Sequence, residues 1–158
     1  MDYMLILQNS IWAGLFACGL GILLTAPSRY LAMAFLCGFA GRFIRDVSIG
    51  MGQGQNWATV LAAASIVLLA FTVVRRDDAS PVVVVTGILP LGAAMAMFAA
   101  IWELMKVSSA TGEALEQASL ALNASIGKVF TTSLAIAVGL AVGMAIVKNF
   151  VREEELKS

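Results

Sequence analysis

The stretch TGILPLGAAMAM, residues 86–97, places a proline between two glycines inside a long apolar run. Pro90 has no amide proton, so it cannot donate a helical hydrogen bond to the carbonyl of Thr86, and its ring clashes with the same turn. Gly87 and Gly92 lower the cost of bending the chain nearby. Lipid offers no water to the backbone groups released in this way, so they are tolerated only inside protein or beside a wet cavity. The stretch therefore predicts a membrane helix that is broken or kinked at Pro90.

The composition around this stretch is that of an integral membrane protein. Of 158 residues, 60% are hydrophobic and only 13% are charged. Ten Lys and Arg residues balance ten Asp and Glu residues, so the chain lacks the basic surface that binding to nucleic acid requires. There is no histidine, the two cysteines are isolated, and the sequence contains no serine-hydrolase, metalloprotease or phosphate-loop motif. We therefore expect no metal, no cofactor and no catalytic residues, and the protein is not expected to be an enzyme.

The distances between charged residues predict the membrane spans, because about 20 apolar residues cross the hydrocarbon core as a helix. The uncharged segments long enough to span are residues 4–25, 57–74, 81–102 and 129–147. Residues 29–47 span only if Arg42 and Arg45 lie near the end of the helix and reach the interface with their long side chains. The expected fold is all-α, a polytopic bundle of five transmembrane helices with a broken fourth helix, or of four if the second segment lies in the interface.

The basic residues predict how the chain is oriented. With five spans, one side of the membrane receives six Lys and Arg residues and the other receives at most four. Short cytoplasmic loops carry the excess of basic residues. The protein is therefore expected in the cell (inner) membrane, with its amino terminus on the outer side and its carboxyl terminus in the cytoplasm. Four spans would instead put both termini on one side. Residues 1–150 then form one transmembrane domain, and residues 151–158 form a charged cytoplasmic tail.

The polar segment 108–123 predicts a surface helix that leads directly into the last span. Thr111, Gly112 and Glu113 suit the start of a helix, and acidic residues in its first turn suit the helix dipole. The alternative interpretation is an element that docks a partner.

Small residues at a spacing of four predict a packing face on the last span. Ala135, Gly139 and Gly143 lie along one side of the helix, where small side chains let another helix approach closely. The pattern leaves open whether that helix belongs to this chain, to a second copy or to another protein.

Ionisable residues at membrane depth are candidate functional residues, because lipid makes their burial costly. Arg42 and Asp46 are four residues apart and can pair on one helix face, which leaves Arg45 to meet an anion or a lipid phosphate. Lys128 precedes the last span, and its amine is suited to a carboxylate solute. For the three basic residues, the alternative is an anchor at the membrane interface.

Three features together resemble the carboxyl-terminal half of the threonine/serine exporter (ThrE-like) family. They are the proline Pro81 after the basic pair Arg75 and Arg76, the motif GILPL at 87–91, and the segment LAIAVGLAVG at 134–143. In the split form of that family, this half is a separate small membrane protein. The resemblance implies a subunit for secondary export of small amino acids or small carboxylates, assembled with a larger membrane partner that carries the complementary half. The candidate residues for the solute pathway are Thr86, Gly87, Pro90, Gly92, Arg42, Arg45 and Lys128.

Two other functions remain as alternatives. In a non-transporting scaffold or accessory subunit, Pro90 is only a kink, and Pro90→Ala leaves transport unchanged. In a small channel made of several copies of this chain, the purified protein conducts without a partner.

Overall fold

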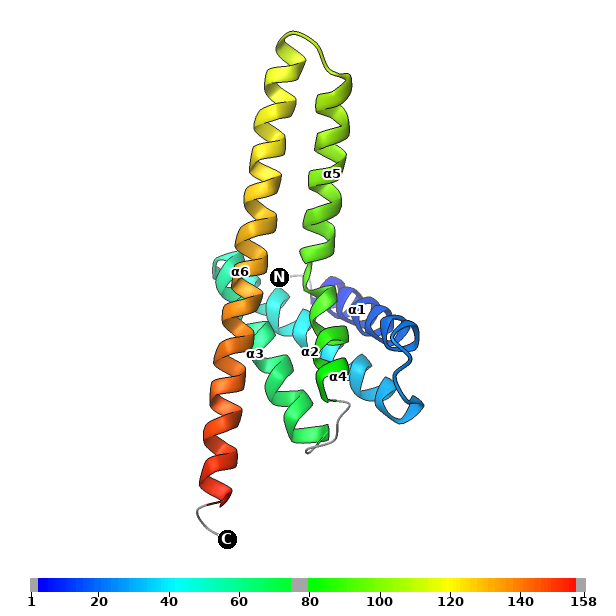
Figure 1. Cartoon of the computed structure of the whole chain (residues 1–158), viewed down its shortest axis with the longest axis vertical. Coiled ribbons are helices and arrows are strands. Elements are labelled where there is room, and N and C mark those ends of the chain that lie inside the picture. Colours follow the sequence, from blue (N-terminus) through cyan, green and yellow to red (C-terminus); the bar gives the residue numbers. More distant parts are fainter. Residues whose placement is uncertain (1–2, 75–79, 156–158) are drawn as a thin grey trace. The chain divides into compact units, whose positions relative to one another are not determined.

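The computed structural model describes residues 3–74 and 80–155, and in this part the protein consists of helices joined by short turns (Figure 1). The elements in chain order are α1 (Tyr3–Leu23), η1 (Ser28–Tyr30), α2 (Leu31–Gly50), α3 (Gln55–Val74), α4 (Ser80–Ile88), η2 (Leu89–Leu91), α5 (Ala93–Ser109) and α6 (Glu113–Glu155). The two η elements are single 3₁₀ turns. The prediction of an all-α fold is confirmed. The basic pair Arg75 and Arg76 and the end of the charged tail, 156–158, lie outside the described residues.

The chain forms two compact units. The first consists of Met1–Leu91 together with Ala135–Ser158, and the second consists of Gly92–Leu134. Helix α6 contributes its first half to the second unit and its remainder to the first.

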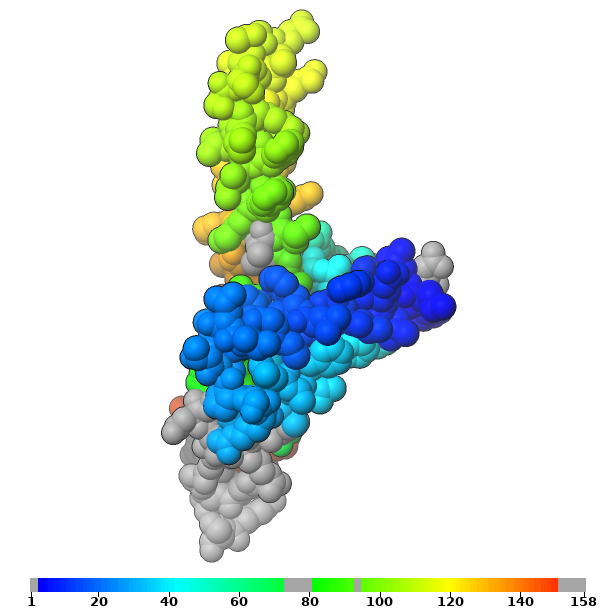
Figure 2. Space-filling view, turned by 90° about the vertical axis from the view of Figure 1, so that its right-hand side faces the viewer, coloured from blue at the N-terminus to red at the C-terminus, as the bar shows by residue number. Residues whose placement is uncertain are grey.

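Helix α2 is the centre of the first unit, because it packs against α1, α3, α4 and η2. Figure 2 shows α1 lying across one side of this unit with α2 directly beside it. A methyl group added at Gly38 would lie 2.6 Å from Cβ of Ala17 on α1, and one added at Gly41 would lie 2.5 Å from Cδ1 of Ile66 on α3. Both distances are too short for real atoms, so these glycines allow α2 to lie unusually close to its neighbours.

The small-residue face of α6 packs against α3 of the same chain. A methyl group at Gly139 would lie 2.5 Å from the carbonyl oxygen of Val60, and one at Gly143 would lie 2.8 Å from Cβ of Val67. Ala135 is 5% exposed and lies on the same face. The helix that the sequence left unidentified is therefore α3.

The second unit is a hairpin of α5 and the first part of α6 (Figure 1). Its turn includes Gly112 with a φ of 65°, a conformation that a residue without Cβ adopts at little cost. Helix α6 begins at Glu113 and runs without interruption to Glu155, so the polar segment is helical from Glu113 onward and leads directly into the last apolar segment, as predicted. Its first residues differ from the prediction, because Ser108 and Ser109 end α5 and residues 110–112 form the turn. Lys106 and Glu103 on α5 form an exposed ion pair at 2.9 Å.

The chain is a multi-pass membrane protein, but five spans are not confirmed. Three stretches are long and apolar enough to cross a bilayer, namely Tyr3–Leu23, Gln55–Thr72 and Glu113–Phe150. The pair Pro81–Leu91 and Met95–Ser109 meets the same condition only when both parts are counted as one interrupted span. The described residues thus contain three candidate spans, or four with the interrupted pair. Helix α2, the predicted second span, is not among these candidates, and it carries the charged residues Arg42, Arg45 and Asp46.

Candidate functional site

The apolar segment after residue 80 is broken at the predicted place. Helix α4 ends at Ile88, a 3₁₀ turn covers Leu89–Leu91, and α5 begins at Ala93. Gly92 joins them with a φ of 105°, a left-handed conformation that other residues adopt only at a cost of about 1–2 kcal/mol. The helical hydrogen bonds resume with the amide of Ala96, which donates to the carbonyl of Gly92 at 3.0 Å.

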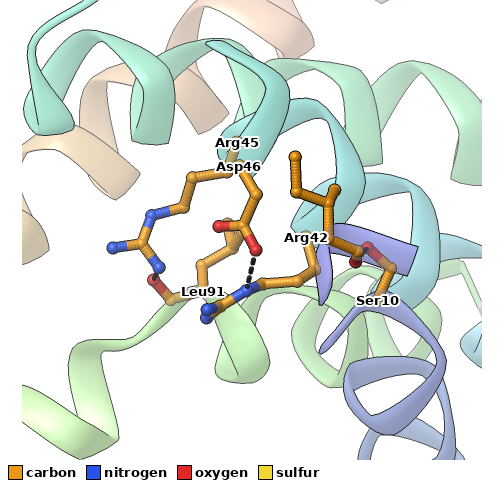
Figure 3. Close-up of polar contacts among 6 residues, drawn as sticks. Ser10, Arg42, Arg45, Asp46 and Leu91 are labelled. Atoms are coloured by element: carbon orange, nitrogen blue, oxygen red, sulfur yellow. Dashed lines mark hydrogen bonds and ion pairs between the residues drawn. The ribbon is translucent and has the colours of Figure 1, made fainter. Parts of the chain in front are cut away.

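The break releases the carbonyl of Leu91, and an arginine from α2 binds it. Nη1 of Arg45 donates to the carbonyl oxygen of Leu91 at 2.6 Å (Figure 3). Leu91 is 0% exposed, and a buried carbonyl without a donor costs about 1–3 kcal/mol. A charged donor is among the strongest partners for such a group, so Arg45 offsets the main local cost of the break.

Arg45 itself is buried and has no acidic partner. Its side chain belongs to the buried face of α2, and the residue is 7% exposed. The adjacent carboxylate, Asp46, accepts instead from Nε of Arg42 at 2.9 Å, which confirms the pair predicted from their spacing. No carboxylate of the described chain lies within ion-pair distance of Arg45. The guanidinium at the break therefore has the Leu91 carbonyl as its direct partner among the described residues, and Asp46 acts on it only from beyond ion-pair distance.

Arg45 also retains unused donors. Its Nε is buried and has no hydrogen-bond partner among the residues described. Removing a cation from water costs several kcal/mol even after the surrounding protein relaxes, so a buried arginine normally satisfies all of its fork. A buried guanidinium with an unpaired donor lowers the stability of the fold unless another group binds it.

Close packing holds α4 against α2 at this point. A methyl group at Gly87 would lie 2.9 Å from Cβ of Cys37 and 3.1 Å from Cγ2 of Ile66. Thr86 is 0% exposed, and its hydroxyl donates to the carbonyl of Val83 in its own helix at 3.0 Å. The glycine thus positions the turn that follows, while the hydroxyl proton of Thr86 is already used.

The structure brings some of the predicted residues together. Arg45 bonds to η2, the turn that contains the half-buried Pro90, and Gly87 packs against Cys37 of the same helix α2. Arg42 is paired with Asp46 and partly exposed. Lys128 is exposed on α6 in the second unit. These positions do not test whether any of the candidates contacts a solute.

The contact between Arg45 and the break was not predicted from the sequence. Arg45 is buried within the protein, and its depth in the membrane, on which the alternative of an interfacial anchor depends, stays a prediction. A signal was present in the stripe of small residues at a spacing of three or four on α2, which continues into the arginine. Its buried members are Ala34, Cys37, Gly38, Gly41, Arg45 and Ser48. An arginine in line with glycines and alanines lies on the packed side of a helix.

Comparison with known families gives one match. A family model described as Threonine/Serine exporter, ThrE, matches residues 9–150. No curated protein and no solved structure matches the chain. The matched region runs from within α1 to near the end of α6, so it contains the break and the arginine that binds it.

Proposed function

This chain belongs to the threonine/serine exporter family, and from that premise we propose that it is one subunit of a two-component secondary exporter. The exported solutes are small amino acids or small carboxylates, and a larger membrane partner carries the complementary half. The family is one of transporters, and the three or four candidate spans of the described residues fit one half of a transporter built from two repeats.

The observation that carries the proposal is the buried arginine at a broken helix. Transporters commonly form their solute sites where a membrane helix is interrupted, because the free backbone groups and helix ends there bind polar ligands. An ionisable residue buried among membrane helices is likewise a mark of a solute or ion pathway. Arg45 and the turn Leu89–Leu91 combine both features in one contact. Thr86, Gly87, Pro90 and Gly92 shape this turn in the proposal.

We place α2 at membrane depth as a fifth span. The support is its central position between α1, α3 and α4, all of them apolar, together with the burial of Arg45. A helix lying in the interface would leave one side to water, and its arginines would extend toward that side. In this proposal the protein lies in the cell (inner) membrane, and its five spans put the amino terminus outside and the carboxyl terminus in the cytoplasm.

Efflux measurements test the function. Cells without other exporters of these solutes are loaded with labelled threonine, serine or a dicarboxylate, and express this chain, the partner, both or neither. We expect faster efflux of at least one solute only when both are present. Equal efflux in all four strains would refute the proposal, and conductance of the purified chain alone would favour a channel.

A further inference from the structure

The unused edge of Arg45 carries an inference that rests on the proposed function and gives it a binding residue. The guanidinium group is a planar fork, and Nη1 is taken by the Leu91 carbonyl. Nε has no partner among the described residues, and no hydrogen bond of Nη2 is found there either. Nε and Nη2 form one edge of the fork, and their two parallel N–H groups match the two oxygens of a carboxylate.

We propose that this edge binds the carboxylate of the exported solute. The Leu91 carbonyl then acts as the support that fixes the plane of the guanidinium, and the solute supplies the missing negative charge. Figure 3 shows that the Asp46 carboxylate is turned to Arg42 on the same helix, so it is not the direct partner of this edge. If Arg45 served only to bind one neutral carbonyl, an uncharged donor would suffice and would avoid the cost of burying a cation.

The described conformation is a closed one with respect to this edge. Nε of Arg45 is buried, so a solute reaches it only after the side chains packed around it move aside. Gly92 directly follows η2, and because it has no Cβ atom, its backbone angles can change at little cost. The proposal therefore includes a local rearrangement at Gly92 that exposes the edge of Arg45 during transport and keeps its bond to the Leu91 carbonyl.

The main test uses Arg45→Lys, with threonine and threoninol as probes. Threoninol replaces the carboxylate of threonine with a neutral CH₂OH group. A lysine keeps the charge and still donates to the Leu91 carbonyl, but it lacks the two-donor edge. Uptake into everted vesicles that hold both subunits gives KM for threonine and its inhibition by threoninol. We expect KM to rise about 10- to 100-fold and the preference for threonine over threoninol to fall toward one.

A matched control and a direct binding measurement complete the test. Lys106→Gln removes an exposed cation of the second unit and should leave both quantities unchanged. In the purified full chain labelled with ¹⁵N-arginine, the Nε–H signal of Arg45, identified by its loss in Arg45→Lys, should shift with threonine and not with threoninol. A shift that follows the phosphatidylglycerol content of the bilayer and ignores threonine would assign the edge to a lipid phosphate and overturn the proposal.

The outcomes separate the two proposals. No efflux of any probe by the wild-type pair overturns the proposed function. Normal wild-type efflux, with unchanged KM and unchanged preference in Arg45→Lys, overturns only the carboxylate site.

Discussion

Arg45 and Leu91 are 46 residues apart in the sequence, yet Nη1 of Arg45 donates to the Leu91 carbonyl oxygen at 2.6 Å. The contact couples α2, the central helix of the first unit, to the turn η2 that follows α4. Any movement of the turn must break or carry along a charge-assisted hydrogen bond in a buried environment, where such bonds are strong. A change at the break therefore affects Arg45, and a change at Arg45 affects the break.

Replacing the arginine by an apolar residue of similar length should separate stability from function. Arg45→Met removes the burial cost of a cation, which is several kcal/mol, but leaves the Leu91 carbonyl without its donor, which costs about 1–3 kcal/mol. We expect the free energy of unfolding to stay unchanged or rise by up to about 2 kcal/mol, while efflux is lost. Thermal unfolding of the purified chain in detergent measures the first quantity.

Arg42→Met serves as the comparison for that variant. It breaks a partly exposed ion pair spaced i,i+4, which contributes only about 0.3–0.5 kcal/mol. A destabilisation of more than about 3 kcal/mol in Arg45→Met would contradict the argument, since it would mean that the arginine is needed for folding rather than for binding.

Gly92 should not tolerate a side chain. Its φ of 105° places an L-residue in a left-handed conformation, so Gly92→Ala should lower the free energy of unfolding by about 1–2 kcal/mol. Gly54→Ala is the matched control, because a methyl group there meets nothing within 4 Å and no left-handed φ is imposed. Equal unfolding temperatures of the two variants would show that the turn is not held in this conformation.

The sequence was sufficient for the features that depend on local chemistry. Pro90 and Gly92 predicted the break, because both act through the backbone of their own turn. Thr111 to Glu113 predicted the start of α6, and the spacing of Arg42 and Asp46 predicted their ion pair. Each of these depends on residues within about one helical turn of each other.

The features that depend on tertiary packing were out of reach. Nothing local to Leu91 indicates which side chain binds its carbonyl, because the donor comes from α2, and α3 and α4 lie between α2 and this turn in the sequence. The partner of the Gly139 face was likewise undetermined, since a small-residue stripe specifies close approach and not the identity of the neighbour. The number of spans stayed open for the same reason: the depth of α2 depends on what surrounds Arg45.

The face of α6 that packs against α3 should not tolerate larger side chains, because a methyl group added there would lie too close to atoms of α3. Gly139→Ala places a methyl group 2.5 Å from the Val60 carbonyl oxygen, so α6 and α3 must separate, at a cost of about 1–3 kcal/mol. Gly127→Ala in the same helix meets nothing within 4 Å, and it should be neutral or stabilise by up to about 1 kcal/mol through helix propensity. Thermal unfolding in detergent compares them, and a Gly139→Ala chain as stable as Gly127→Ala would contradict the packing.

The position of α2 predicts where the two termini lie. If α2 crosses the membrane together with the other spans, the termini are on opposite sides, with the carboxyl terminus in the cytoplasm. Fusions of a fluorescent protein that folds only in the cytoplasm, and of a phosphatase that is active only outside it, report the side of each end. Both termini on one side would remove α2 from the set of spans, or would make the interrupted pair α4 and α5 a re-entrant loop.

Pro90→Ala distinguishes an exporter from a scaffold. Alanine restores the amide proton and the helix propensity at position 90, so α4 can extend through η2 and draw the Leu91 carbonyl away from Arg45. We expect stability to be retained or raised, because a proline inside a helix costs about 3 kcal/mol relative to alanine, and efflux to fall at least about tenfold. Efflux of labelled threonine at matched protein levels, with Pro81→Ala at the start of α4 as the control, provides the measurement. The first turn of a helix tolerates proline, so the control should transport normally. A Pro90→Ala chain that exports at the wild-type rate would leave the break without a role in transport and would favour the scaffold.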